Sequence, residues 1–445
     1  MTATRPGPLS DDRSRRPTDS STSDATPRVA QPGPPASGHR RRARRGRASR
    51  ALAFFALYQV VAWGLLAALA AGSAPWAPWL VLGAVVYTTI PLAIAIRYRG
   101  WPFYPTRAFR VLVVRTFLYA QLLLPFLAAA GLVGLLAGAF IGDPLHAGAW
   151  AVEGTGVALL LLLAAGYLGA RRLTTRDLVV HVAGLPKAFD GFRIVQVSDL
   201  HVGPQTWHGS LLRIADAVRS LEPDIIAVTG DLVDDRHEDA GLYVAGLGTM
   251  SAPDGVFIVP GNHDVYAGWD RLAPALARLP GTRVLVNEAH ILRRGTDVLT
   301  IAGTGDPAGR SFPDVNAAPD IDRTLADVPA GAPVVALAHN PLLWPALAER
   351  GVQLTLSGHT HWGQLAIPAL RWSLVTPFVE YAMGMYRDRN ATLYVHPGTG
   401  YWGIPFRLGA PPEVTRITLR RTVSVFPQEP DKGTHKAEGQ ELGQP

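Results

Sequence analysis

The sequence predicts a chain in two parts: a region of four membrane-spanning helices, followed by an α/β (α+β) domain of two packed β-sheets with helices outside. Two observations carry this prediction. Between residues 51 and 170 the chain contains uncharged apolar stretches of about the length that crosses a bilayer, roughly 20 residues. From residue 192 onward, short β-branched runs alternate with helical segments, and strands predominate toward the end.

Residues 1–50 form the first predicted segment, and we expect them to be disordered. They are rich in Pro, Ser, Arg and Gly and have almost no large apolar residues, so they cannot bury enough surface to offset chain entropy. An arginine cluster at 40–47 ends the segment. A nucleic-acid-binding arm is one interpretation, but the adjoining apolar stretch favours an anchor that faces anionic lipid in the cytoplasm.

Residues 51–170 are predicted to hold the membrane-spanning helices. The four apolar stretches cover residues 51–72, 76–96, 116–141 and 154–170. The first stretch could be a cleaved signal peptide, because small residues follow it, but its length and the three further stretches favour a retained helix. The polar groups at the centres of the stretches are neutral, which favours an anchoring bundle over a transport path.

Arginines set the predicted orientation. They occupy the loop after the second stretch and its junction with the third, at Arg97, Arg99, Arg107, Arg110 and Arg115. Arginines also follow the fourth stretch, whereas the loops at 73–75 and 142–153 contain no Lys or Arg. The positive-inside rule therefore predicts a multi-pass protein of the cell membrane, with both termini and the α/β domain in the cytoplasm.

The rest of the chain divides into a linker (171–191) with strand-like content, the α/β domain (192–427), and a polar tail (428–445) that we expect to be disordered. Charged residues make up 17% of the chain, below the roughly one quarter of an average soluble domain, because the apolar region dilutes them. The chain has 0 cysteines, which excludes disulfides and thiolate metal sites. Any metal must be bound by His, carboxylate or amide groups.

Five short polar motifs each follow a predicted strand of the α/β domain. They are Asp199-Leu200-His201, Gly230-Asp231-Leu232-Val233-Asp234, Gly261-Asn262-His263-Asp264, His339-Asn340-Pro341 and Gly358-His359-Thr360-His361. The first motif alone is a weak signal, but strand ends that all carry such groups are expected to converge at one edge of the sheets. The glycines before Asp231, Asn262 and His359 allow the backbone to turn tightly off each strand.

These ligand types suit Mn²⁺, Fe or Zn²⁺, and two such ions close together suit the hydrolysis of phosphate esters. A carboxylate shared by both ions is the obvious bridge, and Asp231 is the candidate. The ordered set of motifs resembles the calcineurin-like metallophosphoesterase superfamily, over roughly residues 178–419. The resemblance implies a β-sandwich flanked by helices and a centre with two divalent metal ions.

The resemblance also implies roles for individual residues. The first metal would be held by Asp199, His201, Asp231 and His361, and the second by Asp231, Asn262, His339 and His359. His263 would donate a proton to the leaving group, and Asp264 would orient His263. The chain is also similar to the bacterial membrane-associated branch, whose Gly-His-Thr-His-Gly-Gly-Gln signature appears here with Trp362 in place of the second glycine.

Other polar and aromatic residues carry less weight. Asp234 is interpreted either as orienting neighbouring groups or as a helix N-terminal residue. Asp306 is interpreted as a turn residue, and Trp402 as a packing residue, with the lining of a substrate groove as the alternative. Arg407 is a weaker candidate for a phosphate contact.

The predicted function is that of a membrane-anchored, metal-dependent phosphoesterase. A lipid-linked ester is the favoured substrate, because anchoring raises effective concentration only for partners on the same surface. The alternative is a membrane sensor or transporter with a regulatory phosphoesterase-like domain; missing metal ligands would favour it, and none is missing. A nuclease would need a basic, aromatic-rich surface, which residues 199–419 do not indicate, so no stable nucleic-acid partner is expected.

Overall fold

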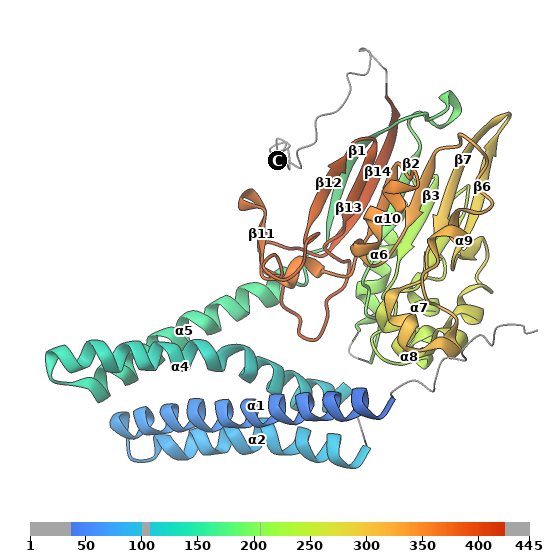
Figure 1. Ribbon diagram of the computed structural model, residues 1–445. Coiled ribbons are helices and arrows are strands. Elements are labelled where there is room, and N and C mark those ends of the chain that lie inside the picture. Colours follow the sequence, from blue (N-terminus) through green and yellow to red (C-terminus); the bar gives the residue numbers. More distant parts are fainter. Residues whose placement is uncertain (1–36, 100–106, 205, 423–445) are drawn as a thin grey trace, which may run out of the picture. The chain divides into compact units, whose positions relative to one another are not determined.

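The computed structural model describes residues 37–99, 107–204 and 206–422 (Figure 1). The N-terminal part of this range is helical. Its elements are α1 (Ser37–Ser73), α2 (Ala77–Arg99), α3 (Arg107–Phe109), the π-helical turn η1 (Arg110–Val114), α4 (Arg115–Ile141) and α5 (Pro144–Gly169). The expected disorder of residues 1–36 and of the tail lies outside the described residues. Helix α1 already begins within the segment that we expected to be disordered, in a run of Arg and Ala, which are good helix formers.

Helices α4 and α5 form an antiparallel pair. Gly142 ends α4 with a positive φ of 79°, and Pro144 occupies the first turn of α5, where its missing N–H costs nothing. Gly134 and Gly138 of α4 lie so close to α5 that a Cβ on either would overlap Ala147. Small residues of this kind let membrane helices approach closely.

The prediction of four membrane-spanning helices is wrong for the described residues, among which three helices are long and apolar enough. These are Ala53–Gly72, Arg107–Ile141 and Pro144–Gly169. The second predicted stretch is helix α2, but its described apolar part, Ala77–Thr89, would be only about 20 Å long against a hydrocarbon core of about 30 Å. Helix α5 begins at Pro144, well before the predicted start at residue 154. The predicted start was too late because the charged Glu153 interrupts the apolar pattern.

The α/β domain contains two six-stranded sheets and one two-stranded sheet, β10-β11. The six-stranded sheets have the orders β1-β14-β2-β3-β4-β5 and β12-β13-β9-β8-β7-β6. The strands are β1 (Thr174–Val182), β2 (Arg193–Val197), β3 (Ile225–Thr229), β4 (Val256–Val259), β5 (Thr282–Val284), β6 (Glu288–Arg294), β7 (Asp297–Gly303), β8 (Val334–Leu337), β9 (Leu354–Ser357), β10 (Ala366–Ile367), β11 (Trp372–Ser373), β12 (Gly384–Asp388), β13 (Ala391–Val395) and β14 (Glu413–Arg421).

The predicted linker is in part a strand of the first sheet. Its β1 pairs in parallel with β14, with Thr174 opposite Glu413, so the folded domain begins ahead of residue 192. In the first sheet β2, β3, β4 and β5 are parallel, and in the second β7, β8 and β9 are parallel. The carboxyl ends of these strands therefore lie at a common edge in each sheet.

The space between the two six-stranded sheets is filled by apolar side chains from both. Ile194, Ile225 and Phe257 come from the first sheet, and Val335 and Leu356 from the second. This buried layer confirms the predicted sandwich. Below the strand ends, the buried side chain of Gln196 on β2 donates to the Ser357 carbonyl oxygen on β9 (3.1 Å) and so joins the two sheets.

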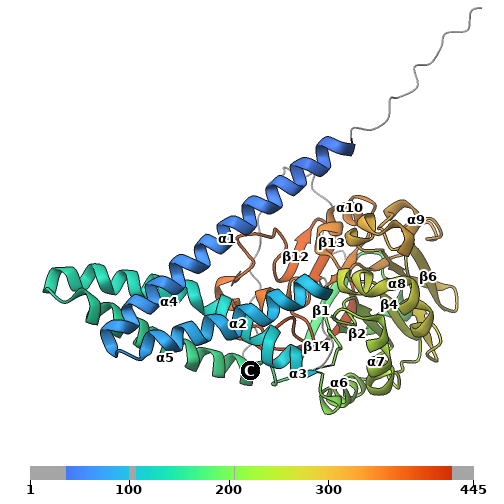
Figure 2. The same ribbon diagram turned by 90° about the horizontal axis from the view of Figure 1, so that it is seen from below.

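Helices cover the outer faces of the sandwich (Figure 2). The α-helices of the domain are α6 (His208–Ser220), α7 (Ala240–Leu247), α8 (Asn262–Leu276), α9 (Ile321–Leu325) and α10 (Trp344–Glu349). The 3₁₀ turns are η2 (Lys187–Phe189), η3 (His237–Asp239), η4 (Pro307–Ser311), η5 (Pro313–Val315), η6 (Pro341–Leu343), η7 (His361–Gln364) and η8 (Pro368–Leu370). Apolar residues of α6, α7 and α8 pack on β2, β3 and β4, which fixes the loops that follow these strands.

Candidate metal centre

The five polar motifs meet at the carboxyl ends of five strands: β2, β3 and β4 of the first sheet, and β8 and β9 of the second. The seven predicted ligands come from the loops that follow directly. They are Asp199, His201, Asp231, Asn262, His339, His359 and His361. The sheet arrangement thus brings residues from distant parts of the sequence together at one edge of the sandwich.

Asp199, His201 and His361 form one ligand group, with all three ligand atoms within 4.8 Å of one another. The Nε2 atoms of His201 and His361 are 3.0 Å apart, and His361 Nε2 lies 3.4 Å from Asp199 Oδ1. The fourth predicted ligand, Asp231, approaches from the side, with Oδ2 3.5 Å from His201 Nε2. Lone-pair atoms that converge in this way fit a single cation.

Asp231, His339 and His359 form a second group within the same 4.8 Å limit. Asp231 Oδ2 lies 3.3 Å from His339 Nε2. Asn262 completes the group, because its Oδ1 lies 2.8 Å from His359 Nδ1 and 3.2 Å from His339 Nε2. One oxygen of Asp231 therefore faces histidines of both groups, which is the position that a bridging carboxylate needs.

The charges at this edge are buried. Burial raises the pKa of Asp231, but His339 and His201 outweigh burial and hold that pKa well below its usual range. Burial lowers the pKa of His339, but Asp231 and Asp199 hold it well above normal. The local excess of negative charge therefore keeps a proton on His339. Divalent cations bound here would neutralise that excess.

The ligand His359 is already in the protonation state that a metal requires. Burial, and then the neighbouring His339, lower the pKa of His359 to about 4, so its ring is neutral at pH 7. His339 Nδ1 lies 2.8 Å from the Thr229 carbonyl oxygen and donates to it, which directs the Nε2 atom toward Asp231. The donor set, its burial and its orientation therefore fit two borderline divalent cations such as Mn²⁺, Fe²⁺ or Zn²⁺.

The backbone at the ligands is strained. Five ligand residues have positive φ, a region that side chains other than glycine rarely adopt: Asp199 (52°), His201 (46°), Asp231 (52°), His359 (72°) and His361 (52°). Strain of this kind persists where the surrounding fold holds it, and it gathers at functional sites. The preceding glycines are needed for close approach, since a Cβ on Gly261 or Gly358 would overlap the carboxylates of Asp231 and Asp199 respectively.

His263 lies beside both groups, with its backbone N–H donating to Asp231 Oδ1 (2.8 Å). Its ring Nδ1 donates to the carbonyl oxygen of Asp234 (2.6 Å), so this carbonyl, and not the expected Asp264 carboxylate, orients the ring. The buried Asp264 carboxylate instead accepts the backbone N–H groups of Leu232 (2.9 Å), Val233 (3.1 Å) and Gly261 (2.9 Å). It therefore shapes the loops that carry Asp231 and Asn262.

Three residues beyond the predicted set take part in the site. The Asp234 carboxylate has Oδ1 3.4 Å from His201 Nδ1, in keeping with the orienting role that the sequence left open. Tyr266 and Trp402 place their rings 5.7 and 6.2 Å from that of His263. Tyr266 lies one helical turn after His263, a spacing that could have identified it from sequence.

The remaining candidates have structural contacts. Arg407 is buried and donates to the carbonyl oxygens of Pro397 (2.5 Å) and His361 (3.0 Å), which makes it a support of the loops and not the suggested phosphate contact. Asp306 caps η4 by accepting from Ala308 N (2.8 Å), as expected of a turn residue. Trp362 keeps the positive φ (49°) that suits the glycine it replaces, and its buried indole donates to the Val395 carbonyl oxygen (2.8 Å).

Comparison with known proteins agrees with this centre. Residues 192–363 match the family described as calcineurin-like phosphoesterase. An uncharacterized metallophosphoesterase of Aquifex aeolicus is 30% identical over 266 residues, which cover 59% of this chain and 97% of the relative. A "transmembrane protein with metallophosphoesterase domain" of Danio rerio is 34% identical over 255 residues, 55% of this chain and 57% of its own.

An uncharacterized metallophosphoesterase of Helicobacter pylori is 32% identical over 256 residues, 57% of this chain and 65% of the relative. The chain thus spans a little over half of the zebrafish relative and about two thirds of the Helicobacter one, whereas it spans almost the whole Aquifex protein. By this last match and by the ordered ligand motifs, the chain belongs to the calcineurin-like metallophosphoesterase family.

Proposed function

We propose that the protein hydrolyses a phosphate ester at a centre of two divalent cations held by the seven ligand residues. The observation that carries this proposal is the Asp231 carboxylate, whose Oδ2 lies 3.5 Å from His201 Nε2 and 3.3 Å from His339 Nε2. Two cations held there would supply positive charge for the phosphoryl oxygens and would acidify a water. The complete ligand set speaks against a purely regulatory domain, which would not need it.

His263 is proposed to donate the proton that the leaving oxygen requires. Because Nδ1 donates to the Asp234 carbonyl oxygen, Nε2 is the ring atom that faces away from this bond and can carry the transferred proton. Burial lowers the pKa of His263 below its usual range, although Asp231 opposes this shift. The negative charge of a bound phosphate ester would raise that pKa and favour the protonated ring.

The protein is also proposed to be anchored in the cell membrane by more than one helix, with the catalytic domain in the cytoplasm. Three helices long and apolar enough to cross a membrane support the anchoring, and the arginines near their ends support the orientation. The name of the zebrafish relative agrees with membrane association.

Single-cysteine variants of this cysteine-free chain test the orientation. Leu145→Cys, in the first turn of α5, is expected to react with a membrane-impermeant maleimide applied to spheroplasts of a bacterial expression host. Lys187→Cys, on the exposed turn η2, is expected to react only after the cells are opened. The reverse pattern would place the catalytic domain outside and contradict the proposed orientation.

The finer proposal is that the substrate is a phosphate ester presented at a membrane surface. Its support is an apolar hairpin, residues 366–378, whose large side chains are exposed to solvent. These side chains and their exposed fractions are Ile367 (46%), Leu370 (72%), Trp372 (37%), Leu374 (45%) and Phe378 (82%). Such a dense exposed apolar group is typical of a contact with a protein or a lipid surface.

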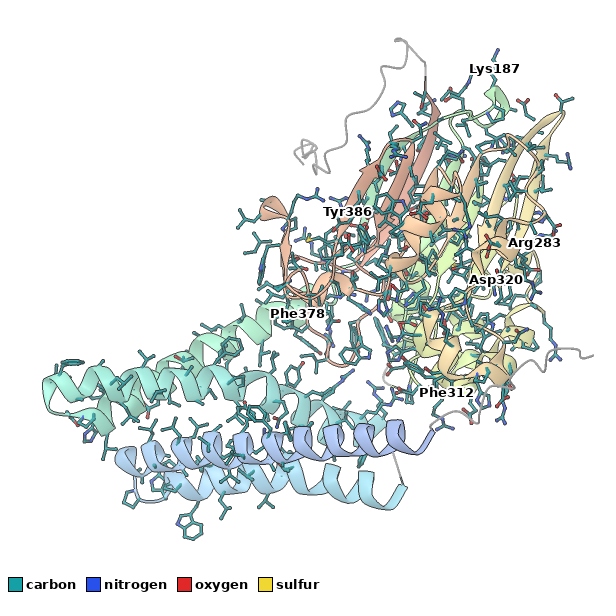
Figure 3. All side chains as sticks on the ribbon, in the orientation of Figure 1. Lys187, Arg283, Phe312, Asp320, Phe378 and Tyr386 are labelled. Atoms are coloured by element: carbon teal, nitrogen blue, oxygen red, sulfur yellow. The ribbon has the colours of Figure 1, made fainter. Side chains whose placement is uncertain are left out.

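Backbone contacts join the start of this hairpin to a candidate membrane helix. Ala366 N donates to the Leu408 carbonyl oxygen (2.9 Å), and the neighbouring Arg407 N donates to the Gly166 carbonyl oxygen of α5 (2.8 Å). Figure 3 labels Phe378 on the loop after β11 and Lys187 at the opposite end of the sheets. A hairpin that starts beside the end of a membrane helix favours the lipid headgroup region as its partner.

A double variant tests this contact. Leu370→Ser with Phe378→Ser is expected to lower turnover of a lipid-embedded ester in vesicles by at least about tenfold, since complete burial of one large apolar side chain contributes about 1.5–3 kcal/mol and burial in the headgroup region is partial. Turnover of a water-soluble ester by the same full-length protein should stay unchanged. Leu212→Ser with Val179→Ser removes comparable exposed side chains elsewhere and is the control. Equal turnover of lipid-embedded esters by both double variants would refute the proposal.

A further inference from the structure

Arg110, at the start of the candidate membrane helix Arg107–Ile141, reaches the catalytic domain. The sequence predicts Arg110 as an arginine of a cytoplasmic loop, where its side chain would be exposed. In the structure this side chain is only 4% exposed. Nη1 lies 2.5 Å from Asp234 Oδ2, and Nη2 lies 3.0 Å from Asp235 Oδ2. A guanidinium that bridges two carboxylates in this way makes directional hydrogen bonds as well as ion pairs.

The two carboxylates depend on Arg110 for compensation of their negative charge. Their side chains are 11% and 15% exposed, so water screens the ion pairs poorly. Buried charges of one sign need a partner of the other sign, because leaving either carboxylate uncompensated is costly. Without the guanidinium, Asp234 and Asp235 would repel each other, and the loop after β3 would relax.

Asp234 connects this ion pair to the metal centre by its side chain and its backbone. Its Oδ1 lies 3.4 Å from His201 Nδ1, on the side of the ring opposite the atom that faces His361. Its carbonyl oxygen accepts from His263 Nδ1 (2.6 Å). A displacement of Asp234 would therefore move a metal-ligand ring and the ring of the proposed proton donor together.

A second arginine near the same end of the helix adds a contact. In the π-helical turn η1, Arg115 N donates to the Arg110 carbonyl oxygen, an i→i+5 bond. Arg115 Nη2 then donates to the Tyr401 hydroxyl (2.7 Å), next to Trp402. In a regular α-helix residues five apart lie about 140° apart around the axis, and the extra residue in the π-turn reduces this angle.

We propose that Arg110 is a positioning residue of the phosphoesterase site, supplied by the membrane region, which holds Asp234 in place for His201 and His263. The role rests on the proposed phosphoesterase function, but the contact itself does not. The helical region is then part of the catalytic site and more than an anchor, and the helix that carries Arg110 and Arg115 sets the geometry at the metal centre.

The contact is tested without any activity. In the cysteine-free full-length chain, Arg110→Cys with Asp235→Cys is expected to form an intramolecular cross-link with a short homobifunctional methanethiosulfonate, detected by mass spectrometry after proteolysis. Arg107→Cys with Asp235→Cys is the matched control, because Arg107 lies on the same helix and is exposed. Equal cross-linking of both pairs, or none for the first, would overturn the contact.

Kinetics test the role. Arg110→Met in the full-length protein is expected to lower kcat by about 10²-fold with KM and bound metal nearly unchanged, because small displacements of catalytic groups cost about that much. Arg110→Lys should recover part of the loss, since one ammonium can satisfy one carboxylate, whereas Arg107→Met should behave as the wild type. Asp235→Asn, which removes the negative charge from one of the two contacts, should give a kcat between those of the wild type and Arg110→Met.

The results of these two experiments distinguish the positioning role, the contact and the proposed function from one another. An unchanged kcat in Arg110→Met, or an equal loss in Arg107→Met, would overturn the positioning role. If Arg110→Met is poorly folded by thermal unfolding, Arg110→Lys and Asp235→Asn carry the test, and normal kcat in both would overturn it. A wild-type protein that hydrolyses no phosphate ester, but still gives the cross-link, would refute the proposed function and leave the contact standing.

Discussion

Asp231→Asn is expected to remove most of the bound metal and nearly all hydrolysis. The substitution keeps the size of the side chain but removes the negative charge from an oxygen that lies 3.5 Å from His201 Nε2 and 3.3 Å from His339 Nε2. Losing a supporting group near a metal ligand costs about 10–100-fold in affinity. Losing a carboxylate common to two ligand groups should cost more than that.

Plasma mass spectrometry of the purified full-length protein measures the metal, and Asp234→Asn is the matched control. Asp234 belongs to the same loop, but its carboxylate faces Nδ1 of His201 (3.4 Å), so its amide variant should lose at most about 10–100-fold in metal affinity, less than Asp231→Asn. Full metal occupancy in Asp231→Asn would refute the bridging role. Equal metal loss in both variants would also contradict a special role for Asp231.

The convergence of the polar motifs could be predicted from the sequence because each motif follows a strand directly. Asp199 follows β2 and His359 follows β9 within two residues of the strand end, and parallel strands bring such positions to a common edge. Gly261 and Gly358 were expected to let the backbone turn tightly, and in the structure a Cβ on either would overlap a carboxylate. Local pattern and chain order were therefore sufficient to propose a metal centre, whereas the assignment of ligands to each metal rests on the family resemblance.

The contacts that orient these ligands could not be predicted in the same way. His263 is held by the carbonyl oxygen of Asp234, and a backbone carbonyl leaves no trace in residue identity. The nearest carboxylate in the sequence, that of Asp264, instead accepts hydrogen bonds from backbone N–H groups. Arg110 and Asp234 are 124 positions apart, and only the tertiary fold brings them together.

His263→Ala is expected to slow hydrolysis of an alkyl phosphate ester by about 10²–10⁴-fold, the range that general acid catalysis contributes. An alkoxide leaving group needs a proton as its bond to phosphorus breaks, and His263 Nε2 is the proposed donor. A nitrophenolate leaves readily without one. The same variant should therefore lose far less activity on a nitrophenyl ester, and its metal content should remain normal.

The decisive measurement is the ratio of the activity that His263→Ala loses on the alkyl ester to the activity that it loses on the nitrophenyl ester. His359→Ala is the control, because removing a ligand that lies 2.8 Å from Asn262 Oδ1 in the second group should damage both substrates alike and lower bound metal. A loss in His263→Ala that is equal for both esters, with normal metal content, would mean that the ring positions substrate or water and donates no proton. A loss confined to the alkyl ester would instead follow from the ring's geometry, since its Nδ1 is already committed to the Asp234 carbonyl oxygen and only Nε2 remains for the leaving group.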